Sequence, residues 1–188
     1  MLRNTLIMIS AMALFGCGDA QTQESNGTAQ TAINAPTDLF TNSRPPDAPG
    51  LAEVKKSASK GDAIRFMGRV GGKVEPFVSS SAVFVVADPS LISCELMGEE
   101  DHCAVPWDYC CEDADDVRNG IGTVRIVDGN GRPLRGSAEN MGGLSPSKFV
   151  LIEGVLQDRN DEGLFIVDAT KIWVGGLPNR ANPLAGMR

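Results

Sequence analysis

The sequence is short of aromatic residues, histidine and positive charge. Of 188 residues, 5% are aromatic, one is histidine, and 17 Lys and Arg stand against 24 Asp and Glu, which gives a net charge of -7. This balance argues against nucleic acid or anionic lipid surfaces as partners, because binding to either depends on basic side chains that neutralise phosphate. With His102 as the only histidine, and that in an acidic segment, a Ser-His-Asp triad has little basis. We therefore expect one non-catalytic domain and no enzyme.

The apolar run near the N terminus is too short to span a bilayer. It extends over about ten residues, from Leu6 to Phe15, where a span needs roughly 20, and Arg3 precedes it. We interpret residues 1–16 as a signal peptide. The string Leu14-Phe15-Gly16-Cys17 resembles a bacterial lipobox, which implies that Cys17 takes a diacylglycerol. The alternative is an ordinary secretory signal followed by a coincidental cysteine.

Composition divides the rest of the chain into three parts. Residues 17–50 are polar and end in prolines, as is typical of a lipid anchor followed by a flexible linker, in which Leu39-Phe40 is the one apolar pair able to dock. Residues 51–176 carry the folded domain, with an insertion at 89–121, and residues 177–188 form a C-terminal tail. We expect the domain in the cell envelope, held to the membrane by the N-terminal lipid. Lipoproteins retained at the inner membrane commonly have aspartate directly after the lipid cysteine. This chain has Gly18 there, which favours the outer membrane facing the periplasm.

The folded domain has the alternation of β-strands. Helical spacing predicts a short N-terminal helix over 51–59, and a period of two predicts five strands over 63–70, 82–87, 123–128, 149–156 and 164–174. Gly68 and Gly154 lie inside strands, where glycine permits the sharp coil of a small barrel. The fold class is therefore mainly β, with an OB-like five-stranded barrel and a Cys-rich acidic insertion. No convincing helix joins the third and fourth strands, so a six-stranded or sandwich-like variant stays open.

Four strings of residues carry a family resemblance. They are Gly68-Arg69-Val70-Gly71-Gly72, Glu75-Pro76-Phe77, Asp88-Pro89-Ser90-Leu91 with Cys94, and above all Pro106-Trp107-Asp108-Tyr109-Cys110-Cys111-Glu112. Over about residues 61–174 the chain resembles a family of uncharacterised secreted or lipid-anchored bacterial proteins with an OB-like domain. The resemblance implies a fold and a location, and it implies no activity.

The insertion concentrates the residues with the richest chemistry. Between Glu95 and Asp116 there are nine acids and no base, and the stretch from Cys94 holds four cysteines, Cys94, Cys103, Cys110 and Cys111. An even number of thiols outside the cytoplasm favours two disulfides and no cofactor, with Cys110 and Cys111 each paired to one of Cys94 and Cys103. The alternative is a zinc or copper site that uses some of these thiols with His102. Against it, Cys-x-x-Cys pairs are missing, and two adjacent cysteines do not easily ligate one ion. A redox thiol pair is the third possibility.

Other side chains are candidates for a binding surface. Trp107 and Tyr109 either cover the insertion as local core or form an exposed surface. Arg65, Arg69 and Arg125 could share an outer strand face near Phe77, as in OB-folds that stack single-stranded nucleic acid, although the net charge opposes that partner. The calcium-like strings that begin at Asp128 and Asp158 do not complete the ligand pattern, and we interpret them as turns.

These observations predict a lipid-anchored, non-catalytic binding or interaction module of the cell envelope, whose partner is an unknown protein or small ligand. The working surface would be the loop from Cys94 to Asp116 and the barrel mouth beside it. The alternative functions are a soft-metal-binding protein and a thiol-disulfide enzyme.

Overall fold

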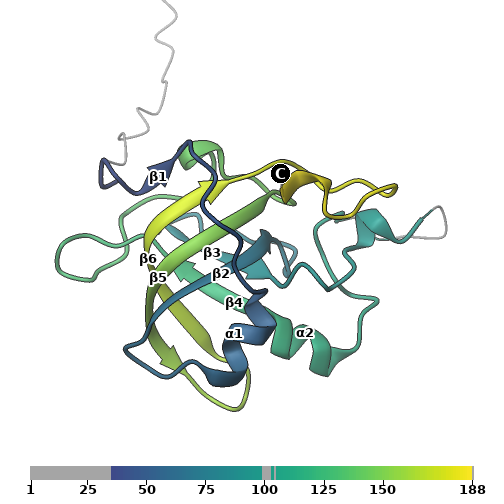
Figure 1. The fold of residues 1–188 in the computed structure, drawn as a ribbon, viewed down its shortest axis with the longest axis horizontal. Helices are drawn as coiled ribbons and strands as arrows, with labels where there is room; N and C mark the ends of the chain where they lie inside the picture. Colours follow the sequence, from purple (N-terminus) through teal and green to yellow (C-terminus); the bar gives the residue numbers. More distant parts are fainter. Residues whose placement is uncertain (1–34, 99–102, 104, 188) are drawn as a thin grey trace, which may run out of the picture. The chain divides into compact units, whose positions relative to one another are not determined.

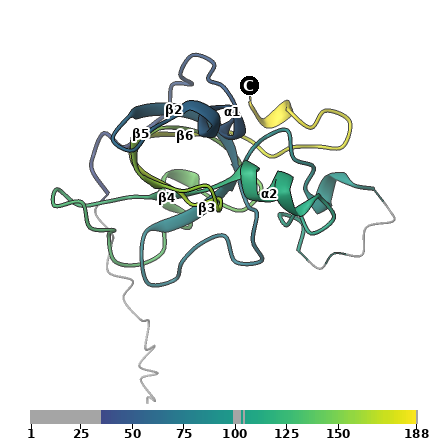
Figure 2. The same cartoon turned by 90° about the horizontal axis from the view of Figure 1, so that it is seen from below.

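A computed structural model describes residues 35–98, 103 and 105–187 (Figure 1). Five strands form a closed barrel, which Figure 2 shows end on. Going around the barrel, β6 neighbours β4, β3, β2 and β5, and β5 pairs with β6 again. All of these pairings are antiparallel except β4 with β6. The strands are β2 (Ala63–Val70), β3 (Val83–Ala87), β4 (Ile121–Arg125), β5 (Phe149–Arg159) and β6 (Phe165–Val174). The expectation of a small five-stranded OB-like barrel is confirmed.

Alternating residues of the strands fill the barrel. Phe66, Phe84, Val124, Ile152 and Val167 come from five different strands and are fully buried in one apolar cluster. A strand of period two presents every second side chain to the interior, and burying each large apolar side chain contributes roughly 1.5–3 kcal/mol. The alternation read from the sequence therefore assigns the inward face correctly.

The helices differ more from expectation than the strands do. Helix α1 (Leu51–Ser57) ends two residues before the predicted boundary. Helix α2 (Ala114–Gly120) lies inside the insertion and was not predicted. The residue in the sequence that signals the start of this helix is Asp113. Its carboxylate accepts hydrogen bonds from the backbone N–H of Asp115 (2.8 Å) and Asp116 (3.4 Å) as an N-cap. The connection from β4 to β5 holds only a short 3₁₀ turn, η2 (Met141–Gly143).

The domain begins before residue 51, so the prediction of a flexible linker up to residue 50 is wrong for its last part. Leu39 is 2% exposed and belongs to the barrel core, and β1 (Phe40–Thr41) pairs in parallel with β6. The docking of Leu39-Phe40 is thus confirmed. The apolar side chains of this pair can be buried on the barrel, whereas the polar composition around them carries no such signal.

The C-terminal segment also packs onto the domain. The N–H of Gly176 donates to the carbonyl of Gly186 in η3 (Ala185–Met187), and Arg180 donates to the carbonyls of Glu95 and Gly98 in the insertion. Residues 177–187 are therefore folded back against the insertion (Figure 1). None of the described helices is long and apolar enough to cross a membrane. The expected signal peptide and Cys17 lie outside the described residues.

A four-cysteine site on the insertion

The insertion brings four cysteine sulfurs together beside the barrel. Cys94, Cys103, Cys110 and Cys111 have Sγ atoms that all lie within 4.8 Å of one another. The Sγ of Cys110 is 3.5 Å from that of Cys94, 2.8 Å from that of Cys103 and 3.9 Å from that of Cys111, and Cys103 and Cys111 are 4.0 Å apart. The cysteines that the sequence singled out thus form one cluster. His102 lies outside the described residues.

Backbone hydrogen bonds hold the two halves of the insertion in register. The N–H of Cys94, at the start of η1 (Cys94–Leu96), donates to the carbonyl of Asp108 at 2.9 Å, and the N–H of Glu95 donates to that of Pro106 at 3.0 Å. These bonds place the segment before Cys110 alongside Cys94. Cys94 and Cys110, which are 16 residues apart in the sequence, are brought together in this way, and Cys111 lies in the same cluster.

The four thiols have different surroundings. Cys94 is buried, Cys103 is intermediate, and Cys110 and Cys111 are exposed. Burial raises the pKa of the Cys94 thiol. Hydrogen bonds from Cys103 and then from Cys94 lower the pKa of Cys110, because they stabilise its thiolate. The cluster is therefore anchored on its inner side and open to solvent on its outer side.

Three of the four sulfur–sulfur separations are close to those of a tetrahedral thiolate site, and the fourth, between Cys103 and Cys110, lies between that distance and the length of a disulfide bond. A disulfide needs about 2.05 Å between sulfurs, and the shortest of the four separations, 2.8 Å, is longer than that. Zinc bound to thiolates at about 2.3 Å in a tetrahedron places sulfurs about 3.8 Å apart, and the other three separations lie close to this edge. The adjacent cysteines Cys110 and Cys111 both place their sulfurs in the cluster. The disulfide pairing stays a prediction.

Tyr109 and Arg69 connect this site to the barrel from inside. Tyr109 is 2% exposed and Arg69 is 1% exposed. The guanidinium donates from Nε to the hydroxyl of Tyr109 (2.8 Å) and from Nη2 to the carbonyl of Leu91 (3.1 Å), and it lies over the rings of Tyr109 and Phe149. Burial raises the pKa of Tyr109 to about 12. The prediction of an exposed surface at Arg69 is therefore wrong, because the insertion covers this face of β2. Of the two alternatives for Tyr109, the structure supports local core.

Trp107 joins the insertion to the loop after β2. Its side chain is partly buried, its indole N–H donates to the carbonyl of Val74 at 3.0 Å, and its own carbonyl accepts from the N–H of Gly72 at 3.0 Å. Trp107 thus packs between two segments rather than standing free, and it serves as local core of the insertion.

The remaining surface candidates are used within the fold. Phe77 packs against Phe84, with ring centroids 5.9 Å apart. Arg125 donates to both carboxylate oxygens of Asp168, at 2.6 and 2.9 Å. Arg65, with 38% of its side chain exposed, has Glu153 at 3.9 Å. The proposed row of arginines beside an aromatic therefore does not form a continuous basic groove.

Both calcium-like strings are turns. Oδ1 of Asp128 accepts from the backbone N–H of Asn130 and Arg132, which holds the pKa of this carboxyl below its usual range. The side-chain oxygen of Asn160 accepts from the N–H of Glu162 and Leu164 in the turn between β5 and β6. These oxygens satisfy the backbone of their own turns, as side chains of this type do.

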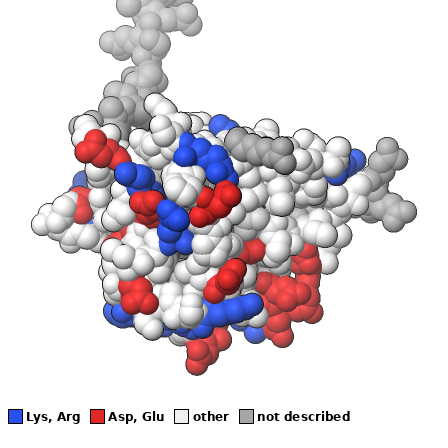
Figure 3. Space-filling view, viewed as in Figure 1, with Lys and Arg blue, Asp and Glu red and all other residues white. Residues whose placement is uncertain are grey.

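Acidic side chains of the insertion gather over α2 (Figure 3). They come from the residues around its N-cap, Glu112, Asp113, Asp115 and Asp116, of which Asp115 pairs with Arg118 at 2.7 Å. The molecule is therefore an OB-like β-barrel with an acidic insertion centred on four cysteines. No family model matches this chain, and no curated protein matches it.

Proposed function

We propose that the protein is a lipid-anchored, non-catalytic module of the bacterial cell envelope that binds one zinc ion through Cys94, Cys103, Cys110 and Cys111. The observation that carries this proposal is the convergence of all four sulfurs within 4.8 Å. Four thiolates around one point suit zinc, since tetrahedral sulfur sites are typical of that ion. Copper(I) is the second soft ion that thiolates select, and the test below separates the two.

The ion would hold the insertion on the barrel. Its ligands would come from both halves of the insertion, so binding would link the segment at Cys94 to the segment at Cys110. Leu91 and Tyr109, which pack together, and the acidic turn before α2 lie next to these segments. Structural zinc sites of this kind supply folding free energy, because the ligand set does not exist in the unfolded chain. The anchor would be Cys17, and the barrel would be the platform that presents the insertion in the envelope.

The metal content of the purified protein tests this function. We expect full-length protein, purified from membranes in detergent without chelator, to contain one zinc per chain by mass spectrometry. Cys103→Ser and Cys94→Ser should lose the ion, because three thiolates bind zinc far more weakly than four. Cobalt(II) should replace zinc and give the intense visible absorption of a tetrahedral thiolate site.

A matched control uses the cysteine outside the cluster. Cys17→Ser should keep one zinc per chain. Stoichiometric copper in place of zinc would overturn the choice of ion and would support the four cysteines as the ligand set. Protein without metal, with all four thiols of the cluster protected from alkylation until reduction, would overturn the metal proposal in favour of disulfides.

The lipid anchor has a test of its own. We expect Cys17→Ser to move the protein from the membrane fraction to the soluble fraction, because the residue that would carry the acyl chains is gone. Fractionation of cells expressing either form measures this, with Cys103→Ser as the control that stays on the membrane. Unchanged membrane retention of Cys17→Ser would contradict the lipobox interpretation.

A further inference from the structure

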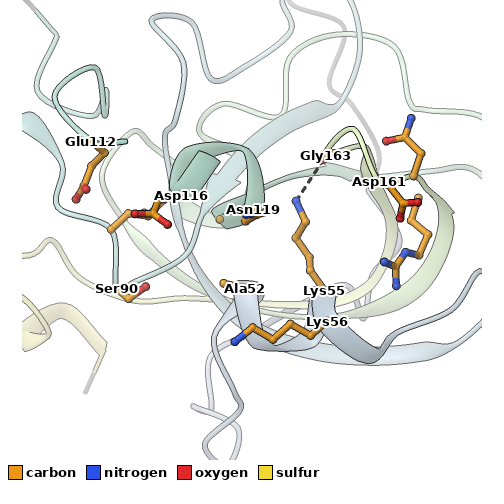
Figure 4. A pocket seen from close by; sticks show the side chains of 13 residues that line it. Ala52, Lys55, Lys56, Ser90, Glu112, Asp116, Asn119, Asp161 and Gly163 are labelled. Carbon is orange, nitrogen blue, oxygen red and sulfur yellow. Dashed lines mark hydrogen bonds between the residues drawn. The ribbon is translucent and has the colours of Figure 1, made fainter. Parts of the chain in front are cut away.

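A cavity of about 640 Å³ lies away from the sulfur cluster, where α1, α2 and the turn between β5 and β6 meet (Figure 4). Its size is in the range of pockets that take small molecules. Six charged side chains line it, together with the polar side chains of Ser90, Asn119 and Asn160. The sequence does not reveal this cavity, because the residues that line it come from segments far apart in the chain.

Lys55 links three of the segments that surround the cavity. Its Nζ donates to the carbonyls of Arg118 (2.9 Å), Ile121 (2.7 Å) and Gly163 (3.2 Å), which belong to the end of α2, the start of β4 and the β5–β6 turn. An ammonium group has three N–H donors, so Lys55 has none left for a ligand. It ties three elements together and contributes a positive charge to the cavity.

That positive charge is poorly compensated. Burial and then the nearby charge of Arg159 lower the pKa of Lys55 to about 8, from its ordinary 10.5. The amine is still mostly protonated at neutral pH. Two further cations line the same cavity, Lys56 on α1 and Arg159 at the end of β5, so the cavity can stabilise an anionic group beside them.

The acidic groups come from two of the segments around the cavity. Glu112 and Asp116 come from the insertion, on the same side as Ser90 in Figure 4, while Asp161 comes from the β5–β6 turn. Backbone contacts fix two more of the charged groups besides Lys55, since Glu112 accepts from the N–H of Ile92 (2.6 Å) and Arg159 donates to the carbonyl of Ala58. Within the described part of the chain, the ion pairs found involve none of the cavity's six charged residues.

We propose that this cavity binds a small zwitterion of the amino-acid type, with its carboxylate toward Lys56 of α1 and its ammonium group toward Glu112 and Asp116 of the insertion. The cavity is lined by three cations and three acids, and none of the described ion pairs uses them. A simple anion would lie beside the acids of the insertion, and a simple cation would lie beside Lys56. A ligand that carries both charges can contact both groups, and charge-assisted hydrogen bonds of this kind are the strong ones. This binding activity is additional to the metal site.

Binding of free amino acids to the zinc-loaded, full-length protein in detergent tests the proposal. A panel of the standard L-amino acids is titrated at millimolar concentration by calorimetry and by chemical-shift changes of the cavity residues. At least one member should bind. Its N-acetyl derivative, which is an anion, and its amide, which is a cation, should each bind at least about tenfold more weakly, because each loses one charge-assisted contact.

Two variants locate the site. Lys56→Gln and Asp116→Asn should each weaken the amino acid about tenfold and leave one zinc per chain. Asp115→Asn is the matched control on the same helix, because Asp115 pairs with Arg118 and does not line the cavity, and its affinity should be unchanged. If no amino acid binds, if the N-acetyl derivative or the amide binds equally well, or if Asp115→Asn weakens binding as much as Asp116→Asn, the proposal is wrong.

Discussion

Arg69→Ala is expected to destabilise the domain by about 3–5 kcal/mol, which is a large part of the stability of a domain of this size. The guanidinium is almost completely buried between Tyr109, Leu91 and Phe149. The substitution leaves a cavity, and it leaves the hydroxyl of Tyr109 and the carbonyl of Leu91 without this donor. Both costs add, because the surrounding structure relaxes only partially around a lost side chain.

Urea denaturation measures this loss, and limited proteolysis of the folded state reports where it acts. The insertion should be cleaved faster in Arg69→Ala, because Arg69 is the hydrogen-bonded link between β2 and the insertion. Arg65→Ala is the matched control four residues earlier on the same strand. Arg65 is 38% exposed on its side chain and has Glu153 at 3.9 Å, so we expect a change of no more than about 1 kcal/mol. Equal losses in the two variants would contradict the role assigned to Arg69.

Gly154→Ala is expected to cost about 2–4 kcal/mol and to lower Tm by about 5–15 °C. A Cβ at this position would lie 2.6 Å from Cγ1 of Val167 and would also collide with the backbone carbonyl of Asp168. The register of β5 against β6 shifts between Glu153 and Gly154, so the glycine sits at an irregularity where the two strands approach closely. Backbone cannot move away as the end of a flexible side chain can.

Gly129→Ala is the control for this prediction. A Cβ at Gly129 has nothing within 4 Å, so its unfolding free energy should change by no more than about 0.5 kcal/mol. Thermal unfolding followed by circular dichroism compares the two variants directly. If the Gly154→Ala protein has the same Tm as the Gly129→Ala protein, β5 and β6 can separate at Gly154 at little cost, and the prediction is wrong.

The four-cysteine cluster could be predicted only in part. The sequence identifies the four cysteines and their segment, and it leaves disulfides, a metal and a redox pair all possible. The adjacency of Cys110 and Cys111 argues against one ion held by both. However, the spacing of cysteines along the chain says little about where an irregular segment folds back. The hydrogen bonds of Cys94 and Glu95 to the Asp108 and Pro106 carbonyls bring the sulfurs together, and no periodic pattern encodes them.

The sequence by itself determined the barrel. Alternation along a strand is a local property, so it assigns the inward residues of each strand and, with Gly154 inside one of them, indicates a small closed sheet. The tertiary structure alone decided what covers the outside. Arg65 and Arg69 lie on the same face of β2. Arg65 is partly exposed and Arg69 is buried, because the insertion packs over only Arg69. Burial of an outward side chain depends on segments distant in sequence, as do the sulfur cluster and the charged cavity.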